Sequence, residues 1–156
     1  MAESKILIAY FSHSGNTRTV AAQIQKMTGG ALHEIKTVEP YPQDYDSVVK
    51  AARAELQADA RPTLSGNLPE VSACTDIYLG YPNWWGTIPM ALFSFLEALD
   101  LSGKTIHPFC THEGSGLGRS VADIQKLCKR SIVGAGLAVK GGSARSAEKN
   151  LRGWIC

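Results

Sequence analysis

The first apolar segment of the chain is Ile6-Leu7-Ile8-Ala9-Tyr10-Phe11, and it continues directly into Ser12-His13-Ser14-Gly15-Asn16-Thr17. The apolar run is typical of a buried strand, and apolar residues recur after the loop at helical spacing over about 16–28. This strand, loop and helix would bring backbone N–H groups, three hydroxyls and a helix N-terminus together, which suits a phosphate dianion. Taken alone, the loop fits a phosphate site and a simple helix cap equally well.

Segments of the same two kinds alternate through the rest of the chain. We expect further strands over 31–38, 76–81, 104–111 and 131–139, and further helices over 44–60, 88–99, 121–127 and from about 143 to 155. The strand over 31–38 alternates in polarity, which predicts a place near a sheet edge. Such alternation of strand and helix predicts an α/β fold with a parallel sheet covered on both faces. At 156 residues the chain is expected to form one domain, 1–156.

Three loops of distinctive composition follow the first, third and fourth expected strands. Ligands of open parallel sheets bind beyond the carboxyl ends of the strands, where the strand order reverses. All three loops would open on that edge. The sequence therefore predicts a single binding site there.

The loop after the third strand is Pro82-Asn83-Trp84-Trp85-Gly86. Adjacent tryptophans at the mouth of a parallel sheet are natural walls for a flat aromatic ligand. A structural role is the alternative, and we expect one tryptophan of the pair to pack under the loop in either case.

The loop after the fourth strand contains Thr111, His112, Glu113, Gly114, Ser115 and Gly116. Its glycines allow the backbone to approach a ring closely. His112 and Glu113 could be donor and acceptor to a ring edge or substrate, or only a solvated pair, and Ser115 could only cap the next helix.

Several other phosphate-binding motifs are missing from the sequence. It lacks G-x-x-x-x-G-K-S/T, and the loop over 12–17 has no lysine to neutralise a triphosphate. The pattern G-x-G-x-x-G does not follow the first strand, and the late glycine run 114–118 has Arg119 where that pattern requires glycine. A receiver domain would need acidic residues where this chain has Ser12 and Pro82. A monophosphate held by neutral donors remains.

Composition argues against other classes of protein. The formal charge is +2, and the one basic cluster, Lys126, Lys129 and Arg130, suits a helix end, so no nucleic-acid role is expected. The cysteines at 74, 110, 128 and 156 form no metal or disulfide pattern, so we expect no metal, three buried thiols and an exposed Cys156. No apolar run approaches the roughly 20 residues of a membrane span, and the N-terminus does not resemble a signal peptide, so we expect a cytoplasmic protein.

Together these residues resemble the flavodoxin family, whose members bind FMN. The first loop matches the family signature S/T-x-S/T-G-x-T, and the resemblance extends over essentially the whole chain. It implies a three-layer sandwich whose five-stranded parallel sheet has the order 2-1-3-4-5. It also implies that Ser12, His13, Ser14, Gly15, Asn16 and Thr17 surround the phosphate, that Pro82, Asn83, Trp84, Trp85 and Gly86 border one side of the isoalloxazine ring, and that Thr111, His112, Glu113, Gly114, Ser115 and Gly116 approach the other.

The chain also departs from electron-carrying flavodoxins, which are usually strongly acidic. It has His112-Glu113-Gly114 where a tyrosine commonly stacks on the flavin, and it looks closer to short flavodoxin-like proteins with Pro-Asn-Trp-Trp-Gly and Thr-His-Glu-Gly-Ser-Gly. Two functions follow from the resemblance. The protein would pass electrons to a redox partner protein through FMN, or it would be an enzyme that takes hydride from NAD(P)H for a quinone or similar small acceptor.

The resemblance suggests two ways in which the chain could tune the flavin. A carbonyl within 83–86 could accept a hydrogen bond from flavin N5–H in the reduced states, since Gly86 lets the backbone reorient. A carboxylate at Glu113 close to the ring would lower the potential. A non-redox role for an empty fold is a third and weaker alternative.

Overall fold

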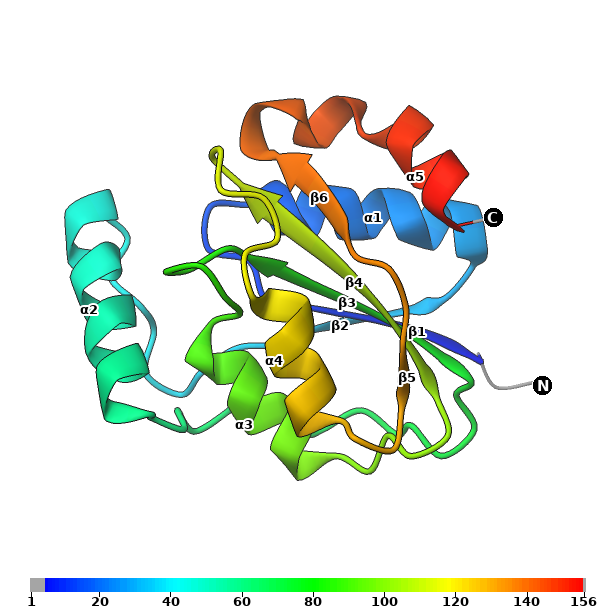
Figure 1. Cartoon of the computed structure of the whole chain (residues 1–156), viewed down its shortest axis with the longest axis horizontal. Helices are drawn as coiled ribbons and strands as arrows, with labels where there is room; N and C mark the ends of the chain where they lie inside the picture. The colour runs from blue at the N-terminus through cyan, green and yellow to red at the C-terminus, as the bar shows by residue number, and fades with distance from the viewer. Residues whose placement is uncertain (1–4, 156) are drawn as a thin grey trace.

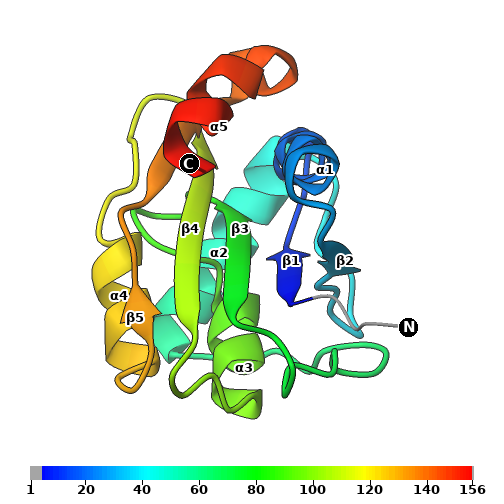
Figure 2. The same cartoon turned by 90° about the vertical axis from the view of Figure 1, so that its right-hand side faces the viewer.

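The computed structural model describes residues 5–155, which form one parallel sheet with helices around it. Its strands are β1 (Ile6–Tyr10), β2 (Ala31–Glu34), β3 (Asp76–Pro82), β4 (Thr105–His112), β5 (Ile132–Val133) and β6 (Leu137–Lys140). The order is β2-β1-β3-β4-β5, with β6 also paired to β4, and every pairing is parallel (Figure 2). The predicted α/β fold and strand order are confirmed.

Helices cover both faces of this sheet. They are α1 (Asn16–Thr28), α2 (Tyr45–Ala58), α3 (Met90–Ala98), α4 (Ser120–Leu127) and α5 (Glu148–Ile155), the last preceded by a 3₁₀ helix, η1 (Gly141–Ser146). In Figure 1, α1 and α5 lie on one face, and α3 and α4 lie on the other. Each face has its own apolar core, with Ile8 and Val20 buried in the first and Leu79 and Phe95 in the second.

The sheet position next to β4 differs from the sequence prediction. One strand was expected over 131–139, but the chain forms β5 and β6 with a break over 134–136. The break lies beside Pro108, which has no N–H to donate. The carbonyl of Ile106 still accepts from the N–H of Gly134 at 2.8 Å, and Pro108, two residues further, faces the same side of β4. The single strand was therefore a wrong prediction, and the missing proline donor accounts for the interruption.

The strand expected over 31–38 is shorter than predicted but lies at the predicted edge. It ends at Glu34, and the N–H of Ile35 makes one further bond to the carbonyl of Tyr10 at 2.7 Å. The chain then turns away, and Thr37 pairs with Leu64 instead.

The helix α2 stands apart from both helical layers, beside the end of the sheet where the central strands point (Figure 1). Asp44 caps it by accepting from the N–H of Ser47 at 3.0 Å, as a helix N-cap should. Only Val48 and Ala52 are buried among its 14 residues. The apolar stripe on α2 therefore faces something other than the sheet.

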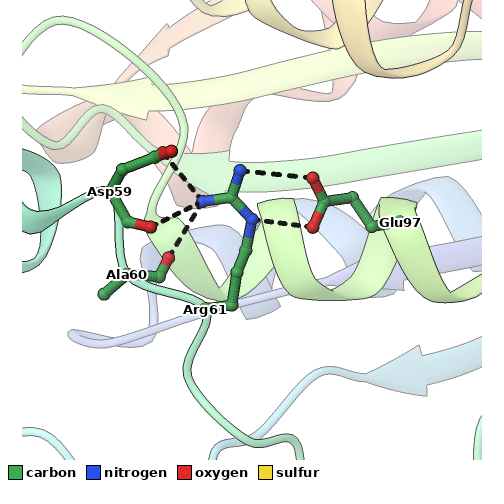
Figure 3. A network of polar contacts seen from close by, with 4 residues as sticks. All are labelled: Asp59, Ala60, Arg61 and Glu97. Atoms are coloured by element: carbon green, nitrogen blue, oxygen red, sulfur yellow. Dashed lines mark hydrogen bonds and ion pairs between the residues drawn. The ribbon is translucent and has the colours of Figure 1, made fainter.

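A polar network at the end of α2 ties it to α3. Arg61 donates from Nε to Oε1 of Glu97 at 2.7 Å and from Nη2 to Oε2 at 3.2 Å, a two-pronged pair (Figure 3). The same guanidinium donates from Nη1 to the Asp59 carboxylate at 2.8 Å and to the carbonyls of Asp59 and Ala60. Because Asp59 terminates α2 with a φ of 50°, this network fixes the direction in which the chain leaves the helix.

Three cysteines, Cys74, Cys110 and Cys128, are buried, as expected. Burial raises the pKa of the Cys110 thiol to about 12, which makes it unreactive. The prediction for Cys156 concerns a position outside the described residues. Over 5–155 no group of histidine, cysteine or acidic side chains is arranged to hold a metal, and no helix there is long and apolar enough to cross a membrane.

Candidate functional site

A cleft of about 230 Å³ opens at the edge of the sheet where the three distinctive loops meet. The first loop contributes His13, Ser14 and Asn16, the second contributes 82–85, and the third contributes 111–113. The fourth wall is α2, through Tyr45, Val48, Val49 and Ala52. The structure thus brings parts of all three predicted loops to one site and adds a helix that the sequence did not point to.

The first loop ends in a helix N-terminus with free donors. The Ser12 hydroxyl accepts from the N–H of Gly15 at 3.1 Å and from that of Arg18 at 3.3 Å, so it folds the loop from within. Gly15 is the N-cap residue at φ 98°, a conformation that glycine adopts without strain. In the described part of the chain, nothing accepts from the first-turn N–H groups of Asn16 and Thr17. An uncapped helix start of this kind fits an anion such as a phosphate.

The charges near this loop leave the anion site to neutral donors. Arg18 projects to the edge strand, where it donates to the Glu34 carboxylate at 2.5 Å, and this contact raises the pKa of Arg18. His13 contacts the carbonyl of Pro42 through Nε2 at 2.7 Å, which joins the loop to the segment before α2.

Thr17 links the first loop to β4. Its hydroxyl lies 2.8 Å from the hydroxyl of Thr111, and both side chains are buried. The Thr17 side chain thus has a partner within the protein, while its backbone N–H remains available.

The second loop forms a tight turn over 84–87. Trp84 and Thr87 exchange backbone hydrogen bonds of 3.0 and 3.3 Å, and the two central residues, Trp85 and Gly86, have φ values of 57° and 82°. Two positive φ values in succession are typical of a type I′ turn. Tryptophan rarely adopts this conformation, so the contacts of Trp85 must hold it there.

The two tryptophans have different surroundings. Trp84 packs edge-on against Phe11 and Tyr41, with ring centroids 5.3 and 5.0 Å away. Trp85 is 43% exposed, donates from Nε1 to the carbonyl of Val49 at 3.0 Å, and has the Arg53 guanidinium over its ring. One tryptophan of the pair packs under the loop, as predicted, and the other is held by α2.

One side-chain and one backbone hydrogen bond join the second loop to the segment from Gly116 to Arg119. Asn83 donates from Nδ2 to the carbonyl of Gly116 at 2.8 Å and accepts from the N–H of Gly86 at 2.9 Å. The Gly86 carbonyl accepts from the N–H of Arg119 at 2.7 Å. A Cβ at Gly118 would lie 2.2 Å from that carbonyl oxygen, so glycine is required for this approach. The Gly86 carbonyl is consequently already engaged within the protein.

In the third loop, His112 and Glu113 face different groups. His112 accepts from the N–H of Gly114 through Nδ1 at 2.9 Å, which favours the tautomer with its proton on Nε2. Glu113 lies beside the start of α1, since a Cβ at Gly141 would be 2.3 Å from Glu113 Oε1 and 2.7 Å from Asn16 Nδ2. Gly114, Ser115 and Gly116 are not among the residues that line the cleft.

The wall formed by α2 is the part of the site that sequence reasoning missed. Tyr45, Val48, Val49 and Ala52 recur at helical spacing, and such a stripe predicts packing without saying against what. The cap at Asp44 located the helix, but no sequence feature placed it over the loops. The complete cleft has free N–H donors at one end and aromatic and aliphatic side chains at the other, so it suits a flat ring carrying a phosphate.

Comparison with known proteins gives a consistent result. A family model described as flavodoxin matches residues 5–155. A crystallised protein from Bacteroides eggerthii, provisionally named a flavoprotein, is 30% identical, with 98% of this chain and 96% of that chain covered and a TM-score of 0.85. A provisionally named flavoprotein from Bacteroides uniformis is 26% identical, with 97% and 99% covered and a TM-score of 0.85.

A flavoprotein from Lactobacillus acidophilus NCFM, crystallised in complex with FMN, has the same fold. It is 20% identical, with 98% of this chain and 99% of that chain covered and a TM-score of 0.79. No curated protein gave a significant match.

Proposed function

The chain belongs to the flavodoxin family, and from this premise we propose that it binds FMN without a covalent bond and transfers electrons through it. The observation that carries the proposal is the cleft itself, with Asn16 and its free N–H at one end and the Trp84–Trp85 loop at the other. The relative from Lactobacillus acidophilus that was crystallised with FMN supports the choice of cofactor.

The first loop would hold the phosphate through the backbone N–H groups of Asn16 and Thr17 and the hydroxyl of Ser14. The Ser12 oxygen shapes this loop by accepting two N–H groups, and its O–H would remain available to donate to a phosphate oxygen. Thr17 would keep the first loop against β4 through Thr111. The residues of the first loop would therefore determine the affinity for FMN, and other residues would tune the chemistry of the ring.

FMN supplies the redox chemistry when it is bound, and the chain controls the surroundings of its ring. The turn over 84–87 and α2 would exclude water from part of the ring, with Trp84 fixed by Phe11 and Tyr41. The Gly86 carbonyl accepts from the N–H of Arg119, so a hydrogen bond from flavin N5–H would use its second lone pair or another carbonyl of the turn. Glu113 lies beside α1, so it would act on the phosphate end more than on the ring.

An enzyme that takes hydride from NAD(P)H is the second candidate. Its support is the formal charge of +2, which differs from the acidic surface expected of an electron carrier that docks on basic partners. The electron donor, the electron acceptor and the cytoplasmic location are predictions from the sequence.

Two measurements test the proposal. The purified protein should take up FMN and show the blue-region absorption of oxidised flavin, and a protein that stays colourless with excess FMN would contradict it. Steady-state oxidation of NADPH in the presence of a quinone then separates the candidates. A carrier should turn over slowly alone and rapidly only with a reductase, whereas rapid turnover by the protein alone would favour the enzyme.

A further inference from the structure

Two arginines border the exposed Trp85 at the ring end of the cleft. Arg53, on α2, has its guanidinium carbon 5.4 Å from the centroid of the Trp85 ring. Arg119, just before α4, has Nη1 3.9 Å from the position that a Cβ would take on Gly86. Elements far apart in the sequence thus place two guanidinium groups next to one turn.

The charges of Arg53 and Arg119 are less compensated than those of three other arginines of the chain. Arg18, Arg61 and Arg152 each form an ion pair with a glutamate. Within residues 5–155 Arg53 forms no ion pair, and Arg119 reaches Asp123 only at 3.7 Å. The same Asp123 oxygen also accepts the Thr87 hydroxyl, which further occupies it. The ring end therefore carries a local positive charge.

The two acidic groups on α2 do not cancel this charge at Trp85. Glu55 stands two residues after Arg53, on the opposite side of the helix, and accepts the Tyr41 hydroxyl there. Asp46 lies seven residues before Arg53, roughly 10 Å along the helix axis, which is about one Debye length at physiological salt. Lys50 stands four residues after Asp46, at the spacing that favours mutual pairing. Glu113, the acidic residue of the third loop, lies beside α1 instead.

Exposed aromatic side chains accompany the two arginines. Tyr45 is 76% exposed, and Trp85 is 43% exposed although its indole N–H is fixed by Val49. Tryptophan, tyrosine and arginine are enriched where protein interfaces gain most of their affinity, and a side chain fixed in advance loses little entropy on binding. Tyr45, Arg53, Trp85 and Arg119 are called the basic aromatic rim below.

We propose that the basic aromatic rim docks a redox partner protein whose contact surface is acidic. The inference rests on the proposed function, because the rim matters for electron transfer only if the cleft beside it holds the flavin. Carboxylates of the partner would pair with Arg53 and Arg119 while Trp85 packs against it, bringing the partner to the ring end. This polarity is opposite to that of strongly acidic carriers that dock on basic partners.

The first test uses the protein without FMN and measures quenching of tryptophan fluorescence by iodide and by caesium. The quenching of Trp85 alone is obtained by subtracting the quenching measured for Trp85→Phe from that of the parent protein. Each ion's value is then divided by its quenching of free N-acetyltryptophanamide. Iodide should quench Trp85 about two-fold or more better than caesium, since local positive charge concentrates anions. Arg53→Gln should remove most of this preference, whereas Lys129→Gln, which changes the net charge equally at a distant exposed site, should leave it. Equal quenching by both ions, or equal effects of the two substitutions, would overturn the proposal.

The second test uses the FMN-loaded, reduced protein and follows its oxidation by ferricyanide or by hexaammineruthenium(III), each of which takes one electron from the flavin. At low salt, the Arg53→Gln/Arg119→Gln pair should slow ferricyanide by about three- to ten-fold and should not slow the ruthenium complex. Lys129→Gln should change neither rate appreciably. Equal slowing of both oxidants would contradict a charge effect at the ring end.

The two tests also separate this proposal from the proposed function. If the protein fails to bind FMN, the second test cannot run, but the first still reports the charge at the rim. If Arg53→Gln instead raises the KM for NADPH several-fold during turnover with a quinone, the rim binds an anionic dinucleotide, and its assignment to a partner protein is wrong.

Discussion

At the scale of single residues, the Thr17–Thr111 contact gives Thr17 a structural role that is distinct from binding the ligand. The two hydroxyls lie 2.8 Å apart in a buried place, so removing one leaves the other without its partner. An unsatisfied buried hydroxyl costs about 1–3 kcal/mol, whereas removing both partners costs much less. The signature threonine of the first loop therefore has a structural role that its sequence position did not reveal.

We expect Thr17→Val to lower the free energy of unfolding by about 1–3 kcal/mol and to weaken FMN binding, with little change in potential. The double variant Thr17→Val/Thr111→Val should recover most of the stability, as measured by urea unfolding. If it also recovers FMN affinity, the Thr17 hydroxyl acts only through the fold. If affinity stays low while stability returns, that hydroxyl contacts the phosphate in the complex.

A second residue-scale feature is the bond from the Tyr41 hydroxyl to Glu55 Oε1, at 2.6 Å, on the inner side of α2. Burial raises the pKa of Glu55 above its ordinary 4.5, although the bond from Tyr41 opposes this. A carboxyl whose pKa is raised in the folded state contributes its stabilisation below the unfolded pKa and loses it as the pH rises through the folded value.

Glu55→Gln should therefore remove a loss of stability that the parent protein suffers as the pH rises above the ordinary glutamate pKa of 4.5. Unfolding by urea at several pH values gives the difference between the two proteins, in which the shared carboxylates cancel. Glu148→Gln, at an exposed carboxylate on α5, serves as the control and should leave the pH profile unchanged. A profile that is the same for Glu55→Gln and the parent would contradict the assignment.

At the scale of elements, α2 combines few buried side chains with a direct contribution to the cleft. Val48 and Ala52 are its only buried residues, and its other anchors are polar: Trp85 to Val49, Tyr41 to Glu55, and Arg61 to Glu97. Segments with few buried apolar contacts open at low free-energy cost. We expect α2 to open more readily than the strands beneath the cleft.

Arg61→Lys should loosen α2 without weakening the sheet, because lysine keeps the charge but cannot make the paired bonds to Glu97 shown in Figure 3. Amide exchange by mass spectrometry should become about three- to ten-fold faster over 45–58 and stay unchanged over β3 and β4. Arg152→Lys, in an exposed pair on α5, is the matched control. Faster exchange over the whole chain would show that Arg61 stabilises the fold globally instead.

At the scale of the whole molecule, periodicity and turn residues predicted most of the architecture. The parallel sheet and α1 follow from short apolar runs alternating with helical stripes, whereas the strand order followed from the resemblance to the flavodoxin family, which the family model matches. The break between β5 and β6 was not predicted, because it depends on where Pro108 falls relative to a neighbouring strand. The position of α2 was not predicted either, because an amphipathic stripe does not identify the surface it covers.

For the candidate site, too, some features could be predicted from the sequence and others could not. Loops at one sheet edge could be placed together from topology alone, and the structure brings His13, Trp84 and His112 to one cleft. Side-chain partners could not be predicted: Thr17 with Thr111, Trp85 with Val49, and Glu113 beside Gly141 all join residues distant in sequence. That Glu113 lowers the flavin potential stays a prediction, and its carboxylate lies near Gly141 and Asn16 in the structure.

The central claim is that the loop at the start of α1 anchors a phosphate attached to a flat ring. It is tested most directly by titrating the protein without cofactor against FMN and against riboflavin, with binding followed by quenching of flavin fluorescence. FMN should bind one-to-one and at least about a hundred-fold more tightly than riboflavin, because only FMN satisfies the N–H groups of Asn16 and Thr17. Equal affinity for the two flavins, or no binding of either, would contradict the account.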